Sequence, residues 1–168
     1  MAGIKYHEAQ DIKDAVRRII TVLGMDHVNV DRVYCIRSHG TSSNNIVARC
    51  HALPKILQQV LEIEPAYVIE ILSEKFDRMS EEDRIKTLIH ELLHIPKTFG
   101  GGFRHHDFVH KRTIDKFYKE FKKSEKHFNF DSEIPEMKER YRIKEEIERK
   151  EREAEESRDP DQNSLWDF

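Results

Sequence analysis

The feature that most constrains this chain is HELLH at residues 90–94, because it lies within an apolar stretch. Ser80 followed three residues later by Asp83 matches an N-terminal capping arrangement, and Pro96 ends the pattern. The sequence therefore predicts a helix from about residue 80 to residue 94. Two imidazoles and a carboxylate on a largely buried helix are costly without partners. The apolar residues of this helix are Ile85, Leu88, Ile89, Leu92 and Leu93.

The spacing inside HELLH is typical of a metal site. Residues four apart on a helix lie about 5–6 Å from each other between Cβ atoms, so His90 and His94 can bind one ion. Glu91 is one position further round and can act on a water molecule without entering the coordination shell. Zinc lowers the pKa of bound water from about 15.7 towards 7 and polarises a carbonyl group. The motif predicts one catalytic zinc ion, with Glu91 as the general base.

A catalytic zinc ion usually has three protein ligands, so a third ligand is expected. Lys97 and Gly100 stand where the longer metzincin pattern requires glycine and histidine, which excludes that class. The remaining candidates for the third ligand follow the glycines at 100–102 in the sequence, and spacing alone does not choose among them. These candidates are His105, His106 and His110, with Asp115 and Glu120 as carboxylate alternatives.

The segment HELLHIPKTFGGGFRHHD, residues 90–107, resembles the motif of metallopeptidases from archaea and phages that are related to the SprT-like zincins. The resemblance covers roughly residues 30–120. In that family the glycine-rich loop is followed by Arg, a residue that is often Pro, His and Asp. Arg104, His106 and Asp107 match, and His105 stands in the proline place. The resemblance implies that His106 is the third ligand, that the fold is α+β and zincin-like, and that the substrate is a protein or peptide.

The rest of the chain reads as alternating helices and strands. Apolar spacing predicts a helix over residues 7–23, ending before Gly24. Residues 30–37 and 46–52 are β-favouring runs joined by a polar loop, and a hairpin is one way to pair them. The remaining predictions are a short helix after Pro54, a strand over 67–72, and a helix around 108–121. The active-site helix is expected to pack on this short sheet, with either the 67–72 strand or one of the preceding pair as the substrate-binding edge.

The length of 168 residues allows one domain with a real core and an appendage. We predict a zincin-like metallopeptidase domain at residues 1–130, a charged helical extension at 131–158 and a flexible tail at 159–168. The N-terminus lacks the apolar region of a secretory signal, and no run approaches the roughly 18 apolar residues of a membrane span. A cytoplasmic location is therefore the default expectation. Cys35 and Cys50 do not form a CxxC pair and are expected to be buried free thiols.

Several other polar residues have an ordinary and a functional interpretation. Arg104 is expected to hold Asp107 in a loop-fixing ion pair or to contact a substrate carbonyl. Tyr67 is expected in the core, with an oxyanion donor as the alternative. The isolated histidines are expected to be surface or hydrogen-bonded residues, and they are His7, His27, His39, His51 and His127.

Two rival functions compete with peptidase activity. A zinc-stabilised binding module without turnover would leave Glu91 unexplained. A nucleic-acid-associated factor is suggested by residues 97–127, where nine basic residues against four acidic ones leave a surplus of five positive charges. Weak DNA association is expected on that basis. Gln162, Leu165 and Phe168 form a QxxLxxF pattern that resembles the sliding-clamp-binding box. The resemblance implies a sliding clamp as partner and a SprT-like protease that is recruited to DNA and acts on proteins bound there; docking on the chain's own domain is the alternative.

Overall fold

The computed structural model describes residues 3–41, 45–125 and 149–150. The chain divides into two units, residues 1–130 and 131–168. In the second unit the described residues are Arg149 and Lys150, which are helical. The rest of the predicted charged extension and the tail lie outside the described residues, including Gln162, Leu165 and Phe168, so the clamp-binding box stays a prediction. None of the described helices combines the length and the apolar character that crossing a membrane requires.

The first unit is built on a four-stranded mixed sheet in the order β1-β2-β4-β3. Its strands are β1 (Lys5–Glu8), β2 (Val33–His39), β3 (Ala48–Ala52) and β4 (Tyr67–Leu72). β2 and β4 are parallel at the centre of the sheet, and β1 and β3 pair with them antiparallel at its two edges. Among the described residues, no further strand pairs with the outer edge of β3.

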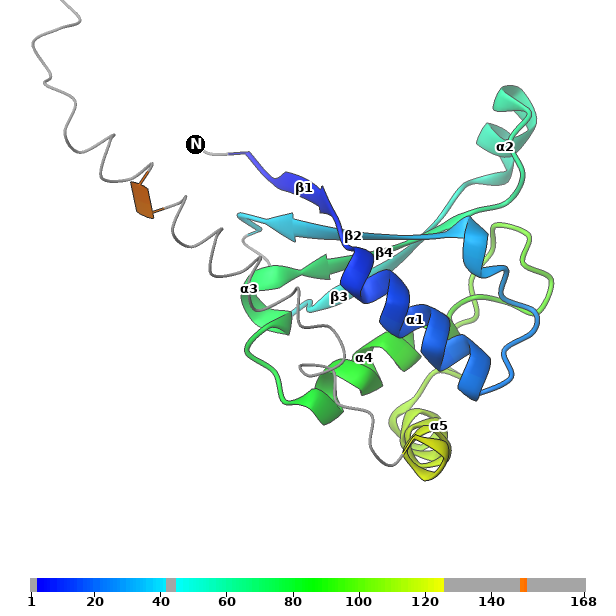
Figure 1. Ribbon diagram of the computed structural model, residues 1–168. Coiled ribbons are helices and arrows are strands. Elements are labelled where there is room, and N and C mark those ends of the chain that lie inside the picture. Colours follow the sequence, from blue (N-terminus) through cyan, green and yellow to red (C-terminus); the bar gives the residue numbers. More distant parts are fainter. Residues whose placement is uncertain (1–2, 42–44, 126–148, 151–168) are drawn as a thin grey trace, which may run out of the picture. The chain divides into compact units, whose positions relative to one another are not determined.

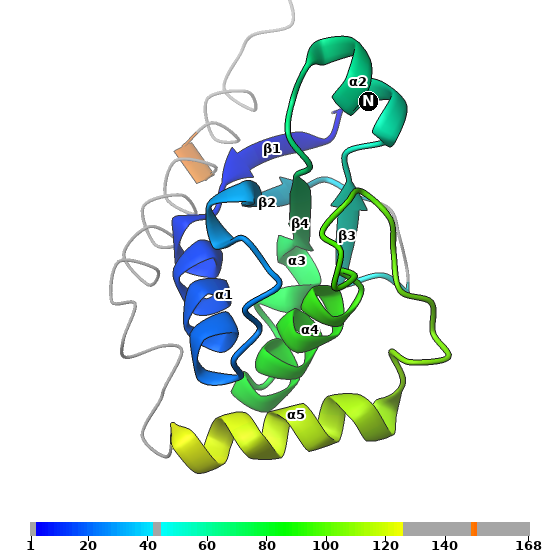
Figure 2. The same cartoon turned by 90° about the vertical axis from the view of Figure 1, so that its right-hand side faces the viewer.

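The longer helices lie on one side of this sheet (Figure 1). They are α1 (Gln10–Val22), α4 (Glu81–Leu93) and α5 (Lys111–Ser124), and two shorter helices are α2 (Lys55–Leu61) and α3 (Ser73–Phe76). A 3-10 turn, η1 (Val30–Arg32), precedes β2. Figure 2 shows α1 and α4 next to the sheet and α5 running across their far side. The prediction of a small α+β domain with the HELLH helix packed on a short sheet is confirmed.

The core forms where the apolar face of the sheet meets the apolar faces of the helices. Apolar residues recur every second position in the strands and at helical spacing in the helices. Tyr67, Ile69 and Ile71 alternate along β4 and are fully buried. α1 buries residues 12, 15, 16, 19 and 20, and α4 buries 85, 88, 89 and 92, which is helical spacing. Each fully buried Ile or Leu side chain contributes about 1.5–3 kcal/mol. The position of α4, and so of its histidines, is thereby fixed against the sheet.

Three sequence expectations are corrected by this topology. Residues 5–8 form strand β1 because they pair with residues 36–39 at the edge of the sheet, so His7 and Glu8 do not begin the predicted 7–23 helix. The two strands β2 and β3 are not a hairpin, because β4 lies between them. The 67–72 strand is central, so it cannot be the substrate-binding edge, and β3 has the free edge on the side of α4.

Candidate metal centre

The helix that carries HELLH is fixed at its start by local chemistry. The Ser80 hydroxyl accepts a hydrogen bond from the N–H of Asp83 at 3.2 Å. Glu81, Glu82 and Asp83 place negative charge in the first turn, where it stabilises the helix dipole. The predicted cap is confirmed. Helix α4 therefore starts in a fixed register and presents residues 90 and 94 on one face.

Three imidazoles converge at the end of α4. The ligand atoms of His90, His94 and His106 all lie within 4.8 Å of one another. His90 Nε2 and His94 Nε2 are 3.0 Å apart, close to the about 3.3 Å expected for two nitrogens that share a tetrahedral zinc ion at 2.0–2.1 Å. In the described part of the chain, no other three histidine, cysteine or acidic side chains form such a group. This donor set fits zinc.

Backbone carbonyls orient two of these rings. The Nδ1 atom of His94 is 2.8 Å from the carbonyl oxygen of Arg104, and Nδ1 of His106 is 3.3 Å from that of Val109. A carbonyl oxygen only accepts hydrogen bonds, so both histidines carry their proton on Nδ1. Their Nε2 lone pairs are then available to a metal ion, and the backbone contacts hold each ring in place.

Burial sets the protonation of the two neighbouring groups on α4. It lowers the pKa of His90 to about 4, with His94 and His106 acting in the same direction, so the His90 imidazole is neutral at pH 7. Burial raises the pKa of Glu91 to about 7, and a hydrogen bond from the N–H of Cys50 opposes this shift. A neutral imidazole can bind a metal, and a carboxylate near pH 7 can both accept and release a proton.

The contact between Glu91 and Cys50 also joins α4 to the free edge of β3. Ladder hydrogen bonds run from Leu53 N to Ala66 O and from Leu72 N to Val47 O, both at 2.9 Å. Along an antiparallel edge strand, successive residues direct their N–H and C=O groups alternately toward and away from the neighbouring strand. Residues 47 and 53 bond residues 72 and 66, so residues 48, 50 and 52 direct their N–H and C=O groups away from β4. The general-base candidate thus accepts from one outward N–H of an edge strand with which no further strand pairs in the described part of the chain.

These groups line one surface groove of about 970 Å³. One wall is the start of β3 and the residues before it, and the opposite wall is α4 and the beginning of α5. The groove contains all three histidines and Glu91. A groove of this size, with convergent polar groups, is the arrangement expected of a binding site for an extended ligand.

Comparison with known proteins agrees with this geometry. Residues 4–143 match a family described as "Putative phage metallopeptidase". The chain belongs to this family. The match includes the whole sheet, helices α1 to α5 and the three-histidine cluster. No curated protein and no solved structure matches the chain.

The loop that carries His106 is held in place by a buried tyrosine. The Tyr67 hydroxyl donates to Gly102 O at 2.9 Å and accepts from Gly101 N at 3.0 Å. Gly101 has a φ of +88°, and a Cβ atom there would lie 2.6 Å from Leu53 O, so only glycine fits. Tyr67 is a core residue as expected; its hydroxyl is held by the loop, so the oxyanion-donor alternative is not supported.

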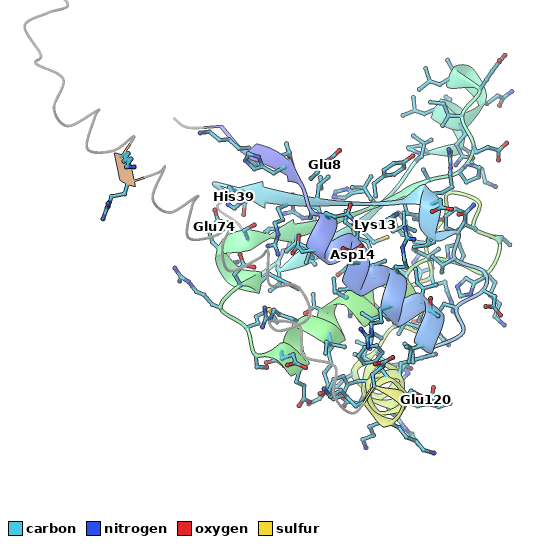
Figure 3. The ribbon with its side chains drawn as sticks, viewed as in Figure 1. Glu8, Lys13, Asp14, His39, Glu74 and Glu120 are labelled. Carbon is cyan, nitrogen blue, oxygen red and sulfur yellow. The ribbon has the colours of Figure 1, made fainter. Side chains whose placement is uncertain are left out.

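The other candidate ligands lie outside the three-histidine cluster. His105 is exposed and belongs to no such group. His110 caps α5, accepting from Thr113 N at 3.4 Å. Asp115 pairs with Lys86 at 2.7 Å. Glu120, labelled on α5 in Figure 3, lies near Lys116 at 4.0 Å.

The isolated histidines have ordinary surroundings. His51 points to the opposite face of the sheet from Cys50 and lies 2.8 Å from Glu70. His39 lies beside Glu74 at the far end of β2, at 3.8 Å (Figure 3), with His7 next to it. These histidines and His27 lie outside the metal cluster. His127 lies outside the described residues.

Two smaller expectations are partly corrected. Arg104 makes no ion pair with Asp107 among the described contacts. Its guanidinium stacks on Phe108 at 3.4 Å from the ring centre, and its backbone N–H donates to His94 O. Cys35 is a buried free thiol, as expected, whereas Cys50 is half-buried. Sequence reasoning did not find the roles of Tyr67 and Gly101 in the loop, since both depend on contacts across more than 30 residues.

Proposed function

We propose that this protein is a zinc-dependent peptidase. The observation that carries the proposal is the convergence of His90, His94 and His106 in the groove that also holds Glu91. Membership in a metallopeptidase family supports the same reaction class. A zinc-stabilised binding module would need the three histidines but not a buried carboxylate beside them.

The three histidines would hold one zinc ion, which supplies a Lewis acid and lowers the pKa of a water molecule that it binds. Glu91 acts as the general base that takes the proton from the attacking water and returns it to the leaving amine. Its buried position strengthens its interaction with nearby charge. An extended peptide pairs with the outward N–H and C=O groups of β3 that Glu91 does not occupy, so recognition rests on main-chain atoms and needs little sequence preference.

The metal site is tested first, by measuring zinc content and zinc affinity for single alanine variants of the three histidines. Each variant should lose affinity by at least tenfold, because each removes one of three ligands. His105→Ala is the matched control and should retain zinc. Removing zinc should also lower the thermal midpoint of the wild-type protein, since binding stabilises only the folded state. Retention of zinc by His106→Ala together with loss in His105→Ala would reassign the third ligand.

Catalysis is tested separately with Glu91→Gln and, as control, Glu8→Gln at the opposite edge of the sheet (Figure 3). Glu91→Gln should bind zinc with unchanged affinity and lose most hydrolysis of an unfolded protein substrate, because the amide cannot accept the proton. Glu8→Gln should behave as wild type. Undiminished hydrolysis by Glu91→Gln would disprove the role of this carboxylate.

The finer relationship to SprT-like proteases and to DNA rests on the sequence alone. Arg112, Lys116, Lys119 and Lys123 are exposed at helical spacing on α5, which a basic nucleic-acid-binding face requires. A solvated helix face has the same pattern. DNA association, action on DNA-bound proteins, clamp binding and a cytoplasmic location therefore stay predictions.

A further inference from the structure

Helix α2 carries an exposed apolar surface that the proposed reaction does not use. Figure 2 shows α2 projecting beyond the ends of β3 and β4. Five aliphatic side chains in and after this helix are 42–71% exposed, whereas the helix buries no residue. Single exposed apolar residues are ordinary, but a cluster on one projecting element marks an interaction site. We call this cluster the α2 patch, and it consists of Ile56, Leu57, Val60, Leu61 and Ile63.

The α2 patch is held in a fixed orientation by the opposite side of its helix. Positions 56, 57, 60 and 61 lie on one face of a helix, and Gln58 lies on the other. The Gln58 amide donates to Leu53 O at 2.6 Å and to Gly100 O at 3.5 Å. Gly100 belongs to the loop that carries His106. The apolar face is therefore directed away from the domain by contacts that include the metal-site loop.

The position of α2 along the chain relates the patch to the groove. Glu91 contacts the edge strand at Cys50, which places the reaction centre near that residue. Leu53 and Pro54 continue directly from β3 into α2, which begins at Lys55. Five residues of extended chain span about 16 Å. A polypeptide paired with the edge of β3 would reach α2 about five residues to one side of its scissile bond.

We propose that the α2 patch binds an apolar segment of an unfolded polypeptide substrate, about five to eight residues to one side of the bond that is cleaved. This inference rests on the proposed peptidase function and specifies its substrate class. Two residues, Leu53 and Pro54, join β3 to α2, so one extended chain that pairs with the edge of β3 can also reach the patch. Substrates would then be selected by apolar residues away from the scissile bond. Main-chain pairing with β3 would hold the part of the substrate between those residues and the scissile bond.

Charge and size disfavour two other occupants. Helices that lie on membranes are rich in Lys and Arg, whereas α2 and the three residues after it contain one cation, Lys55, and two acidic residues, Glu62 and Glu64. A stable dimer buries about 800 Å² on each partner, which five partly exposed side chains cannot supply by themselves. A short apolar stretch of an extended chain needs far less area.

The test uses zinc-loaded Glu91→Gln protein, which should bind without cleaving, and two labelled 20-residue peptides of equal net charge. One peptide has Leu and Val near both ends, and the other has Ser and Thr there. Fluorescence anisotropy should give at least fivefold tighter binding of the apolar peptide. Adding Ile56→Ser and Val60→Ser should remove this difference. These side chains are 70% and 71% exposed, so the fold should tolerate the change; the thermal midpoint and both single variants check it.

Ile4→Ser is the matched control, because Ile4 is 47% exposed next to β1 at the opposite edge of the sheet. It should leave the preference for the apolar peptide intact. Persistence of the preference in the Ile56→Ser/Val60→Ser protein would overturn the proposal. So would a wild-type dimer, or binding to phosphatidylcholine vesicles, that this double variant abolishes. Failure of the wild type to hydrolyse peptides would refute the peptidase function separately, since peptide binding is measured without turnover.

Discussion

Replacing Tyr67 with Phe should weaken zinc binding although Tyr67 is not a ligand. The hydroxyl is the only group that this change removes, and the ring stays in the core. That hydroxyl bonds Gly101 N and Gly102 O, which lie between His94 and His106. We expect the loop to sample positions in which His106 is too far away to complete the three-histidine cluster.

The size of the effect follows from the exposure of the two loop groups. A buried polar group left without a partner costs about 1–3 kcal/mol, and an ordinary hydrogen bond contributes about 0.5–1.5 kcal/mol net. Gly101 is half-buried, whereas Gly102 is exposed and can regain a water molecule. The combined loss should therefore be about 1–2 kcal/mol. If this free energy is lost from the loop conformation that binds zinc, the zinc dissociation constant rises about 5- to 30-fold.

The assay is competition for zinc with a chelator, combined with thermal unfolding of the zinc-free protein. Tyr34→Phe is the control, because Tyr34 is 50% exposed on β2 and should show neither effect. Tyr67→Phe should lose zinc affinity while the zinc-free protein retains a cooperative unfolding transition. A zinc affinity within twofold of wild type, with a clearly less stable zinc-free protein, would show that Tyr67 acts only in the core and would refute the reasoning.

Two further predictions concern buried polar groups away from the groove. Burial raises the pKa of Cys35 to about 12, so at pH 8 its thiolate fraction is about a thousandfold below that of a free cysteine, and iodoacetamide should label it only after unfolding. Through the same shift, stability should fall as pH rises from about 8.5 towards 12, because only the unfolded chain loses this proton. Asp11→Ala should cost about 1–3 kcal/mol in urea unfolding, since Asp11 pairs at 2.7 Å with Arg37, which is 6% exposed and keeps Asp77 at 2.9 Å as its second partner. Exposed Asp14 is the control, and equal losses for Asp11→Ala and Asp14→Ala would contradict the role of this pair.

Helix α4 could be predicted almost completely because its determinants are local. Ser80 and Asp83 form the cap within one turn, and the apolar positions repeat at the helical period over the next ten residues. The pairing of His90 with His94 follows from helix geometry alone. The same holds for α2 and β4, whose bounds Lys55–Leu61 and Tyr67–Leu72 agree with the sequence pattern.

The sequence predictions differ from the structure where pairing between distant strands determines the fold. All four residues of β1 are exposed, so the strand has no alternation of buried and exposed side chains to indicate it. The apolar spacing begins at Ala9, directly after this strand, so the sequence offers no signal that separates β1 from the start of α1. The β2–β3 hairpin was a reasonable expectation for consecutive strands, but a parallel pairing of β2 with β4 places β4 between them. Local propensity carries no information about that insertion.

The choice between His105 and His106 shows why the third ligand candidate could not be derived from spacing. Adjacent loop residues point in different directions, and the direction depends on how the loop is anchored. Here the anchors are Arg104 N to His94 O at 2.7 Å, and the Tyr67 hydroxyl on the glycines. Each joins segments that are separated in the sequence, by 10 residues in the first case and by about 35 in the second. The sheet and α4 therefore position the loop together. This is why replacing Tyr67 on strand β4 should change the affinity for zinc.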